Sequence, residues 1–211
     1  MRNTLLGISS LFCLSLLLFR VTFLESFMFV FLLWNLFLAA VPYIVSNFLQ
    51  NARSKWVSFG LFGIWLLFFP NAPYILTDLF HLKHRQLGEI WFDLLMILSF
   101  AWTGLMFGFY SFLDVEKRLE AEVGSISGKL IMSGSLFLAG FGIYLGRFLR
   151  WNSWDILQHP FELGQDILHR FVHPFSHERT WGMTILFGIL LNLMIWFIKS
   201  VSEENHKTNI A

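Results

Sequence analysis

Long apolar stretches alternate with short polar segments along the whole chain. A transmembrane helix needs about 20 mostly apolar residues, because each residue rises about 1.5 Å and the hydrocarbon core is about 30 Å thick. The sequence therefore predicts six membrane-spanning helices, at residues 4–20, 27–48, 55–70, 90–112, 130–149 and 180–199. The predicted fold is all-α: a polytopic membrane helical bundle, with one integral-membrane domain over 1–200 and a polar tail over 201–211.

The third predicted span is short and runs into two prolines, Pro70 and Pro73. Proline has no amide hydrogen to donate, and it disfavours helical geometry in the residue before it. Two interpretations stay open. In one, the helix continues as a broken helix within the membrane, which requires cover from protein or a wet cavity. In the other, the span ends at Pro70 and a surface helix follows.

Two connecting segments differ in pattern. Residues 114–129 are rich in charge and predict a connecting loop with a helical start. Residues 154–173 instead repeat large apolar side chains near helical spacing, with charged residues and histidines between them. This pattern predicts an interfacial helical segment between the last two spans, broken at Pro160 and ending near Pro174.

Composition supports a membrane protein. The chain is 56% hydrophobic and 14% charged, against about 25% charged residues in a soluble domain. A net charge of +1 provides no field that would attract nucleic acid, and a single cysteine excludes an internal disulfide and a cysteine-based metal cluster. Arg2 and the apolar run after it resemble a signal peptide. Because no small-residue cleavage site follows, we expect an uncleaved first helix.

Basic residues indicate the orientation. With Arg147 and Arg150 set aside as embedded, eight lysines and arginines fall on the amino-terminal side of the predicted spans and five on the other. The positive-inside rule then places both termini in the cytoplasm. Six of the seven histidines fall on the opposite side. Loops 71–89 and 150–179 therefore share the non-cytoplasmic face in this prediction.

Polar residues at the ends of the apolar spans are the candidate chemistry. Asp78 and His81 are three residues apart, Asp93 lies one turn into the fourth span, and Arg147 and Arg150 share a helix face. A charge at bilayer depth usually faces protein or a water-filled cavity, and arginine binds carboxylates and phosphates. We therefore predict one polar cluster near the non-cytoplasmic face. Its members are Asn71, Tyr74, Asp78, His81, Asp93, Arg147, Arg150, Asn152 and Asp155.

Metal ligation is a weaker interpretation. His169 and His173 are four residues apart and Asp166 precedes them, so one helix face offers a pair of imidazoles. No H-E-x-x-H motif accompanies them, and the sequence predicts no metal site and identifies no cofactor. His84, between two basic residues, is interpreted as solvated. Glycines in the fifth span, Gly140 among them, predict close helix packing.

Three motifs together resemble a known family. They are the run from Phe69 to Leu82, the triplet Trp91-Phe92-Asp93, and the run from Gly146 to Asp155. They are similar to a bacterial multi-pass membrane family, domain of unknown function 1361, and the resemblance covers the chain from about the second span to the sixth. It implies a bacterial inner-membrane protein and implies no activity.

Three function classes stay open. The first is a binding or transport-accessory protein that holds an anionic lipid headgroup or a small anion in the polar cluster. The second is a membrane-embedded enzyme that uses aspartate and histidine for acid-base or metal chemistry. The third is a structural or assembly subunit whose polar network fixes the fold. Membrane lipids are the predicted partners, nucleic acid is not, and the sequence indicates no protein partner.

Overall fold

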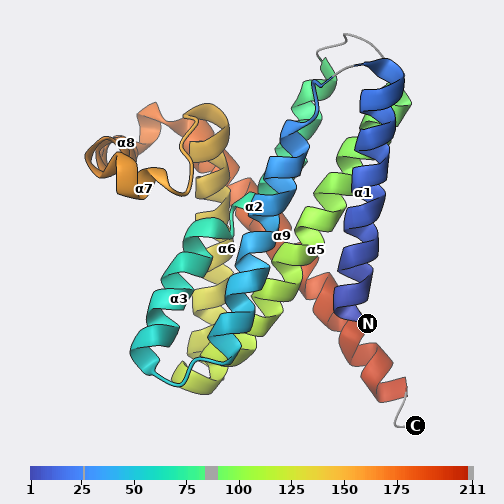
Figure 1. Ribbon diagram of the computed structural model, residues 1–211. Helices are drawn as coiled ribbons and strands as arrows, with labels where there is room; N and C mark the ends of the chain where they lie inside the picture. The colour runs from blue at the N-terminus through green and yellow to red at the C-terminus, as the bar shows by residue number, and fades with distance from the viewer. Residues whose placement is uncertain (26, 84–89, 209–211) are drawn as a thin grey trace. The chain divides into compact units, whose positions relative to one another are not determined.

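The protein is an all-α polytopic bundle, as predicted. The computed structural model describes residues 1–25, 27–83 and 90–208, and this part of the chain contains helices and no strands (Figure 1). Six of its helical stretches are long and apolar enough to cross a membrane. They are Arg2–Phe23, Phe31–Gln50, Lys55–Leu82, Ile90–Val123, Ser125–Phe148 and Glu178–Ser202.

The helices follow the apolar pattern closely. In chain order they are α1 (Arg2–Leu24), α2 (Phe31–Gln50), α3 (Lys55–Phe68), α4 (Asn71–Tyr74), the 3-10 helix η1 (Ile75–Lys83), α5 (Ile90–Val123), α6 (Ser125–Phe148), α7 (Asp155–Gln158), α8 (Pro160–Val172), the 3-10 helix η2 (Pro174–Ser176) and α9 (Glu178–Thr208). The predicted interfacial segment thus forms helices α7 and α8, with Pro160 in the first turn of α8.

The third span passes both prolines without leaving right-handed helical geometry. Phe69 and Pro70 keep helical dihedrals between α3 and α4, and η1 continues the path in tighter turns. Ala72, Pro73 and Ile75 are buried. Protein therefore covers the segment in which proline removes backbone donors, which is the condition for an interrupted helix at membrane depth.

The predicted loop over residues 114–129 is wrong. Helix α5 continues to Val123 and α6 begins at Ser125, so a single residue, Gly124, separates them. Gly124 has φ of 90°, a conformation that favours glycine. The charged residues instead support the helix, since Arg118 pairs with Glu122 one turn later at 2.8 Å.

The described chain divides into two compact units, Met1–Glu122 and Val123–Ala211. The prediction of one domain over 1–200 stays a prediction. In unit 1, contacts at one end join the start of α1 to the end of α2 and the later part of α5. Arg2 pairs with Asp114 at 2.9 Å, and Gln50 donates to the Asp114 carbonyl. Successive spans of unit 1 therefore alternate in direction.

Unit 1 is held together by close packing of the third span on α5. A Cβ added at Gly104 would lie 2.7 Å from Ile75 Cδ1, and one added at Gly108 would lie 2.7 Å from the Ala72 Cβ. Two glycines four residues apart thus let α5 approach the proline segment, as in small-residue packing of membrane helices. This contact places η1 against the start of α2, where the polar residues lie.

Unit 2 is built on the antiparallel pair α6 and α9. Ser133 donates to Asn192 at 2.7 Å near one end of the pair, and Gly140 lies against Thr184 further along. A Cβ at Gly140 would stand 2.7 Å from the Thr184 carbonyl oxygen, so the predicted close packing is confirmed there. Helices α7 and α8 occupy the connection between these two helices.

Two further predictions concern His84 and the C-terminal residues 201–211. His84 lies outside the described residues. The polar tail predicted over 201–211 begins inside a helix, because α9 continues to Thr208 and its apolar stretch ends at Ser202.

Candidate functional sites

One end of unit 1 contains a buried ion pair. Arg20, in the last turns of α1, donates from Nε to Asp93 Oδ1 at 2.6 Å and from Nη2 to Asp93 Oδ2 at 3.0 Å. The Arg20 side chain is 2% exposed and that of Asp93 is 14% exposed. A two-point arginine–carboxylate pair of this kind is both strong and directional. Asp93 thus has its arginine partner, Arg20, within unit 1.

A second carboxylate is buried nearby, on η1. Asp78 is 1% exposed and accepts a hydrogen bond from Asn35 Nδ2 at 2.7 Å. His81 Nδ1 lies 3.1 Å from the Asp78 carbonyl oxygen and 3.8 Å from its carboxylate Oδ1. The predicted Asp78–His81 pair is therefore present. The tight turns of η1 place its residues one turn apart on the same side.

Aromatic rings connect these two groups. The Arg20 guanidinium lies 4.5 Å from the centre of the Phe29 ring, Phe29 packs on Phe31 at 6.1 Å, and Phe31 packs on His81 at 4.9 Å. We call Arg20, Asn35, Asp78, His81 and Asp93 the Arg20 cluster. It brings together the end of α1, the start of α2, η1 and the start of α5.

Two other predicted residues of unit 1 lie outside the Arg20 cluster. Asn71 donates to the Phe68 carbonyl at 2.8 Å, which supports the turn between α3 and α4 after a proline. Tyr74 is partly exposed. The cluster itself offers a closed ion pair, a buried acceptor and an imidazole that can exchange a proton.

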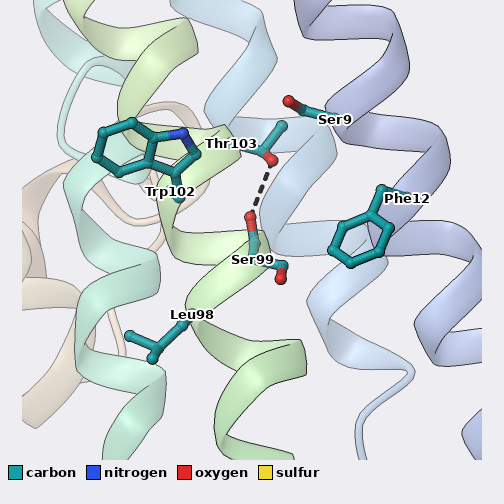
Figure 2. Close-up of a pocket in the computed structure, with 6 residues that line it drawn as sticks. All are labelled: Ser9, Phe12, Leu98, Ser99, Trp102 and Thr103. Carbon is teal, nitrogen blue, oxygen red and sulfur yellow. Dashed lines mark hydrogen bonds between the residues drawn. The ribbon is translucent and has the colours of Figure 1, made fainter.

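Unit 1 also has a shallow hollow between α1 and α5, with a volume of about 240 Å³ (Figure 2). Its walls are Phe12, Leu98 and Trp102. The hydroxyl of Thr103 donates to the Ser99 carbonyl at 2.8 Å, and that of Ser99 to the Leu95 carbonyl at 2.7 Å. The hydroxyl protons of Ser99 and Thr103 are thus committed to the backbone, and the hollow, which Ser9 also lines, presents mainly apolar surface.

The predicted residues of unit 2 gather where α6 ends. Arg147 lies in the last turn of α6, and Arg150 follows in the left-handed region with φ of 63°. The Trp151 amide closes the turn by donating to the Leu145 carbonyl at 3.1 Å. Asp155 Oδ2 accepts from the Asn152 amide at 2.6 Å and from its side chain at 3.2 Å. Asn152 and Asp155 therefore form one local turn before α7.

A further arginine, on α8, is buried at the junction of α6, α8 and α9. Arg170 is 6% exposed, and its Cζ lies 5.7 Å from the centre of the Tyr144 ring. Its Nη1 donates to Asp166 Oδ1 at 3.1 Å and to the Asp166 carbonyl. The other carboxylate oxygen of Asp166 accepts from Trp151 Nε1 at 2.8 Å. Both oxygens of Asp166 are thus engaged.

Several hydrogen-bonding atoms at this junction have no protein partner among the described residues. Arg170 Nε, Thr180 Oγ1 and Trp181 Nε1 are buried and make no hydrogen bond. Thr180 and Trp181 stand in the first turn of α9, and the Trp181 ring packs edge-on against Phe171, the neighbour of Arg170, at 5.0 Å. Buried polar atoms without partners are rare in native proteins, and an unseen ligand or water is one explanation. We call Arg170, Thr180 and Trp181 the Arg170 site.

Three histidines border the Arg170 site. His169 Nδ1 lies 2.8 Å from His177 Nε2, and the His169 and His173 rings are 4.9 Å apart. Removal from water, followed by the positive charge of Arg170 and of the other two histidines, lowers the pKa of His177 below its ordinary value. Within the described residues, no three histidine, cysteine, aspartate or glutamate side chains form a group that could hold a metal ion.

Sequence reasoning missed one buried arginine in each unit: Arg20 in unit 1 and Arg170 in unit 2. The sequence could have indicated Arg20. Because successive spans alternate in direction, the end of the first span and the start of the fourth, with Asp93, lie on the same side of the membrane. It could also have indicated Arg170, because Asp166 lies four residues before it and points along the same helix face. The prediction that the polar residues of both units form one cluster stays a prediction.

Comparison with known proteins places the chain in a family. No curated protein and no solved structure matches it. The model of a family described as "Protein of unknown function (DUF1361)" matches residues 34–194, which is most of the chain and includes parts of both units. The chain therefore belongs to the DUF1361 family.

Proposed function

We propose that this membrane protein binds an anionic group, most simply a phosphate, at the Arg170 site. One observation carries the proposal: Arg170 Nε on α8, and Thr180 Oγ1 and Trp181 Nε1 in the first turn of α9, are buried polar atoms that make no hydrogen bond within the described protein. Leaving such an atom buried and unbonded costs about 1–3 kcal/mol, and an acceptor supplied by a ligand removes that cost.

The chemistry of these atoms selects an acceptor. The guanidinium and indole N–H groups can only donate, and a hydroxyl can donate as well. A phosphate presents several acceptor oxygens, and arginine binds it as a fixed fork of donors. The first turn of α9 adds the positive end of a helix dipole beside the same residues.

A comparison within the chain shows why one unused donor is not enough. Arg118 in unit 1 also leaves its Nε without a hydrogen bond. Its Nη2, however, donates hydrogen bonds to the Ala52 carbonyl and to Ser58, and it pairs with the Glu122 carboxylate. No second unbonded donor among the described residues stands beside it. The Arg170 site differs because three such atoms lie on α8 and the first turn of α9, which the contact between the Phe171 and Trp181 rings brings together.

Residues at the end of α6 extend this proposal. Arg147, Arg150, Asn152 and Asp155 are the predicted members in unit 2, and we propose that the two arginines strengthen attraction of the anion. Arg150 supports this because it holds a left-handed backbone conformation that costs an ordinary residue about 1–2 kcal/mol. For Asn71, Tyr74, Asp78, His81 and Asp93 in unit 1, we propose a role in fixing the fold.

Thermal unfolding in a neutral detergent tests the proposal. Sodium phosphate should raise the unfolding temperature of the parent by on the order of 2–4 °C at about ten times the dissociation constant, relative to sodium chloride at equal ionic strength. Arg170→Gln should lose this protection. Lys129→Gln, which removes an exposed charge near the other end of α6, should keep it. Equal protection by phosphate and chloride in the parent would overturn the proposal.

We further propose that the protein lies in a bacterial inner membrane with both termini in the cytoplasm. The eight-to-five bias of basic residues supports this orientation. Reporter fusions after Lys55, His84, Lys117 and Arg179 should read inside, outside, inside and outside. A cytoplasmic reporter after His84 would reverse the orientation while leaving six spans intact.

A further inference from the structure

Helix α8 turns Arg170 inward and large apolar side chains outward. Arg170 is 6% exposed, whereas Phe161 is 83%, Leu168 63% and Val172 59% exposed. The spacing of seven and four residues puts these three apolar side chains on one face of the helix. A helix on the surface of a soluble protein has the opposite arrangement, with its apolar stripe facing the core.

Exposed apolar side chains also flank α8. Leu157 of α7 is 85% exposed and Phe175 of η2 is 92% exposed. We call Leu157, Phe161, Leu168, Val172 and Phe175 the outer apolar face. Exposed apolar surface of this extent needs a partner that excludes water.

The bilayer is the partner that fits the outer apolar face. Helix α8 has 13 residues, which is too short to cross a membrane. A short amphipathic helix between two spans lies in the plane of the interface, with its apolar side among the upper acyl carbons. The face is also continuous along the chain with α6 and α9, two helices apolar enough to span.

The width of the helix then fixes the depth of the Arg170 site. Arg170 and the outer apolar face lie on opposite sides of one helix, whose diameter with side chains is about 10 Å. If the outer face touches acyl carbons, Arg170 stands within about that distance of them. In a phospholipid the first acyl carbons also lie within this distance of the phosphate, whereas a dissolved phosphate ion has no chains.

We propose that the anionic group bound at the Arg170 site is the phosphate of a membrane lipid, whose acyl chains pack along the outer apolar face. This inference rests on the proposed function, since it names the molecule that carries the phosphate. Two features of the lipid are then recognised together: the phosphate by Arg170, Thr180 and Trp181, and the chains by Phe161, Leu168 and their neighbours.

The test separates these two features. The protein is purified in neutral detergent, incubated with equal amounts of dioleoyl phosphatidylglycerol and dioleoylglycerol, which has the same chains and no phosphate, and analysed by native mass spectrometry. Inorganic phosphate protection is measured in parallel by thermal unfolding. The variants are Arg170→Gln and the double variant Phe161→Ser with Leu168→Ser. Ile126→Ser, at an equally exposed position at the start of α6, is the control.

We expect the parent to retain phosphatidylglycerol over dioleoylglycerol by on the order of tenfold, since one charge-assisted contact to the phosphate is worth about 1.4 kcal/mol. The double variant should lose most of this retention and keep the protection by inorganic phosphate. Arg170→Gln should lose both, and Ile126→Ser should lose neither. Should the double variant fold poorly, Phe175→Ser alone is compared in its place.

The outcomes are distinguishable. Protection by inorganic phosphate with no preference for phosphatidylglycerol, or with retention unchanged in the double variant, would overturn the lipid inference and leave anion binding in place. Absence of phosphate protection in the parent would be a failure of the proposed function itself.

Discussion

The Arg20 cluster and the Arg170 site both bury an arginine, and in each arginine one nitrogen makes no hydrogen bond within the described chain, Nη1 in Arg20 and Nε in Arg170. The two arginines differ in how they pair with a carboxylate and in what surrounds them. Arg20 matches two nitrogens to both oxygens of Asp93, and that carboxylate is 14% exposed. Arg170 gives one nitrogen to Asp166, which is 38% exposed and is shared with Trp151. Its Nε makes no hydrogen bond, and neither do Thr180 Oγ1 and Trp181 Nε1 in the first turn of α9.

The difference separates two roles for a buried charge. An arginine closed by its own carboxylate has little capacity left for a ligand, and removing one partner leaves the other charge uncompensated. An arginine with unbonded neighbours incurs a cost in the folded state that a ligand can remove. We therefore assign the first arginine to folding and the second to binding, and the predictions below test that assignment.

The largest effect is expected from Arg20→Ala. It leaves the Asp93 carboxylate in an apolar setting without its counter-ion, which should cost about 3–5 kcal/mol of unfolding free energy. Folded protein recovered from detergent, measured by size-exclusion chromatography and thermal unfolding, should fall sharply.

The matched control removes both charges. Arg20→Met combined with Asp93→Leu replaces the ion pair with apolar side chains and should recover most of the lost stability, because neither charge is left alone. A double variant as unstable as Arg20→Ala would show that Arg20 acts through something other than this pair. The assignment of Arg20 to folding through its ion pair with Asp93 would then be wrong.

A smaller loss of stability is expected from Arg170→Gln. Asp166 is partly exposed and keeps Trp151 as a donor, so losing Arg170 should cost about 1 kcal/mol or less. Thermal unfolding without added phosphate measures this cost. A loss as large as that of Arg20→Ala would mean that both arginines fix the fold, and the contrast between them would disappear.

Much of the fold could be predicted from sequence because lipid imposes simple rules. Helix length and apolar composition alone indicate six spans, and the structure contains six helical stretches that satisfy the same criteria. The error over residues 114–129 arose because charge was taken as a sign of a loop. Charged residues also stabilise helices through pairs one turn apart, as Arg118 and Glu122 do.

The site was harder to predict because pairing is a tertiary property. Asp78 and His81 are neighbours in sequence, and their spacing predicted the pair. Asn152 and Asp155 were predicted only as members of the polar cluster, and the structure shows that they bond to each other. Arg20 and Asp93 are 73 residues apart, and only the packing of α1 against α5 selects that pair over other arginines. Unbonded donors such as Arg170 Nε have no sequence signature, since they are defined by contacts that are not made.

Arg150→Gly tests whether Arg150 contributes its charge to anion binding in unit 2. Glycine adopts the left-handed conformation at little cost, which gains about 1–2 kcal/mol, while its larger chain entropy costs about 0.5–1 kcal/mol. Unfolding free energy should therefore rise by about 0.5 kcal/mol, whereas phosphate protection should weaken as one positive charge is lost. Arg150→Asn, which tolerates the same backbone conformation, separates the charge from the strain. Unchanged protection in both variants would remove Arg150 from the proposed site.

The smallest effect concerns His177, outside the spans and beside the Arg170 site. Loss of hydration, then the charges of Arg170, His169 and His173, lower its pKa in the folded protein. Between that lowered pKa and the ordinary value of about 6.5, the unfolded chain binds more protons, so stability falls as pH drops through this window and levels off below it.

A bound phosphate adds negative charge nearby and should raise the pKa of His177 towards its ordinary value. NMR titration of the His177 ring in detergent, with and without phosphate, measures the change. The Arg170→Gln variant should also raise this pKa, because a positive neighbour is gone, and phosphate should then move it no further. A phosphate-induced shift that persists in Arg170→Gln would place the anion elsewhere.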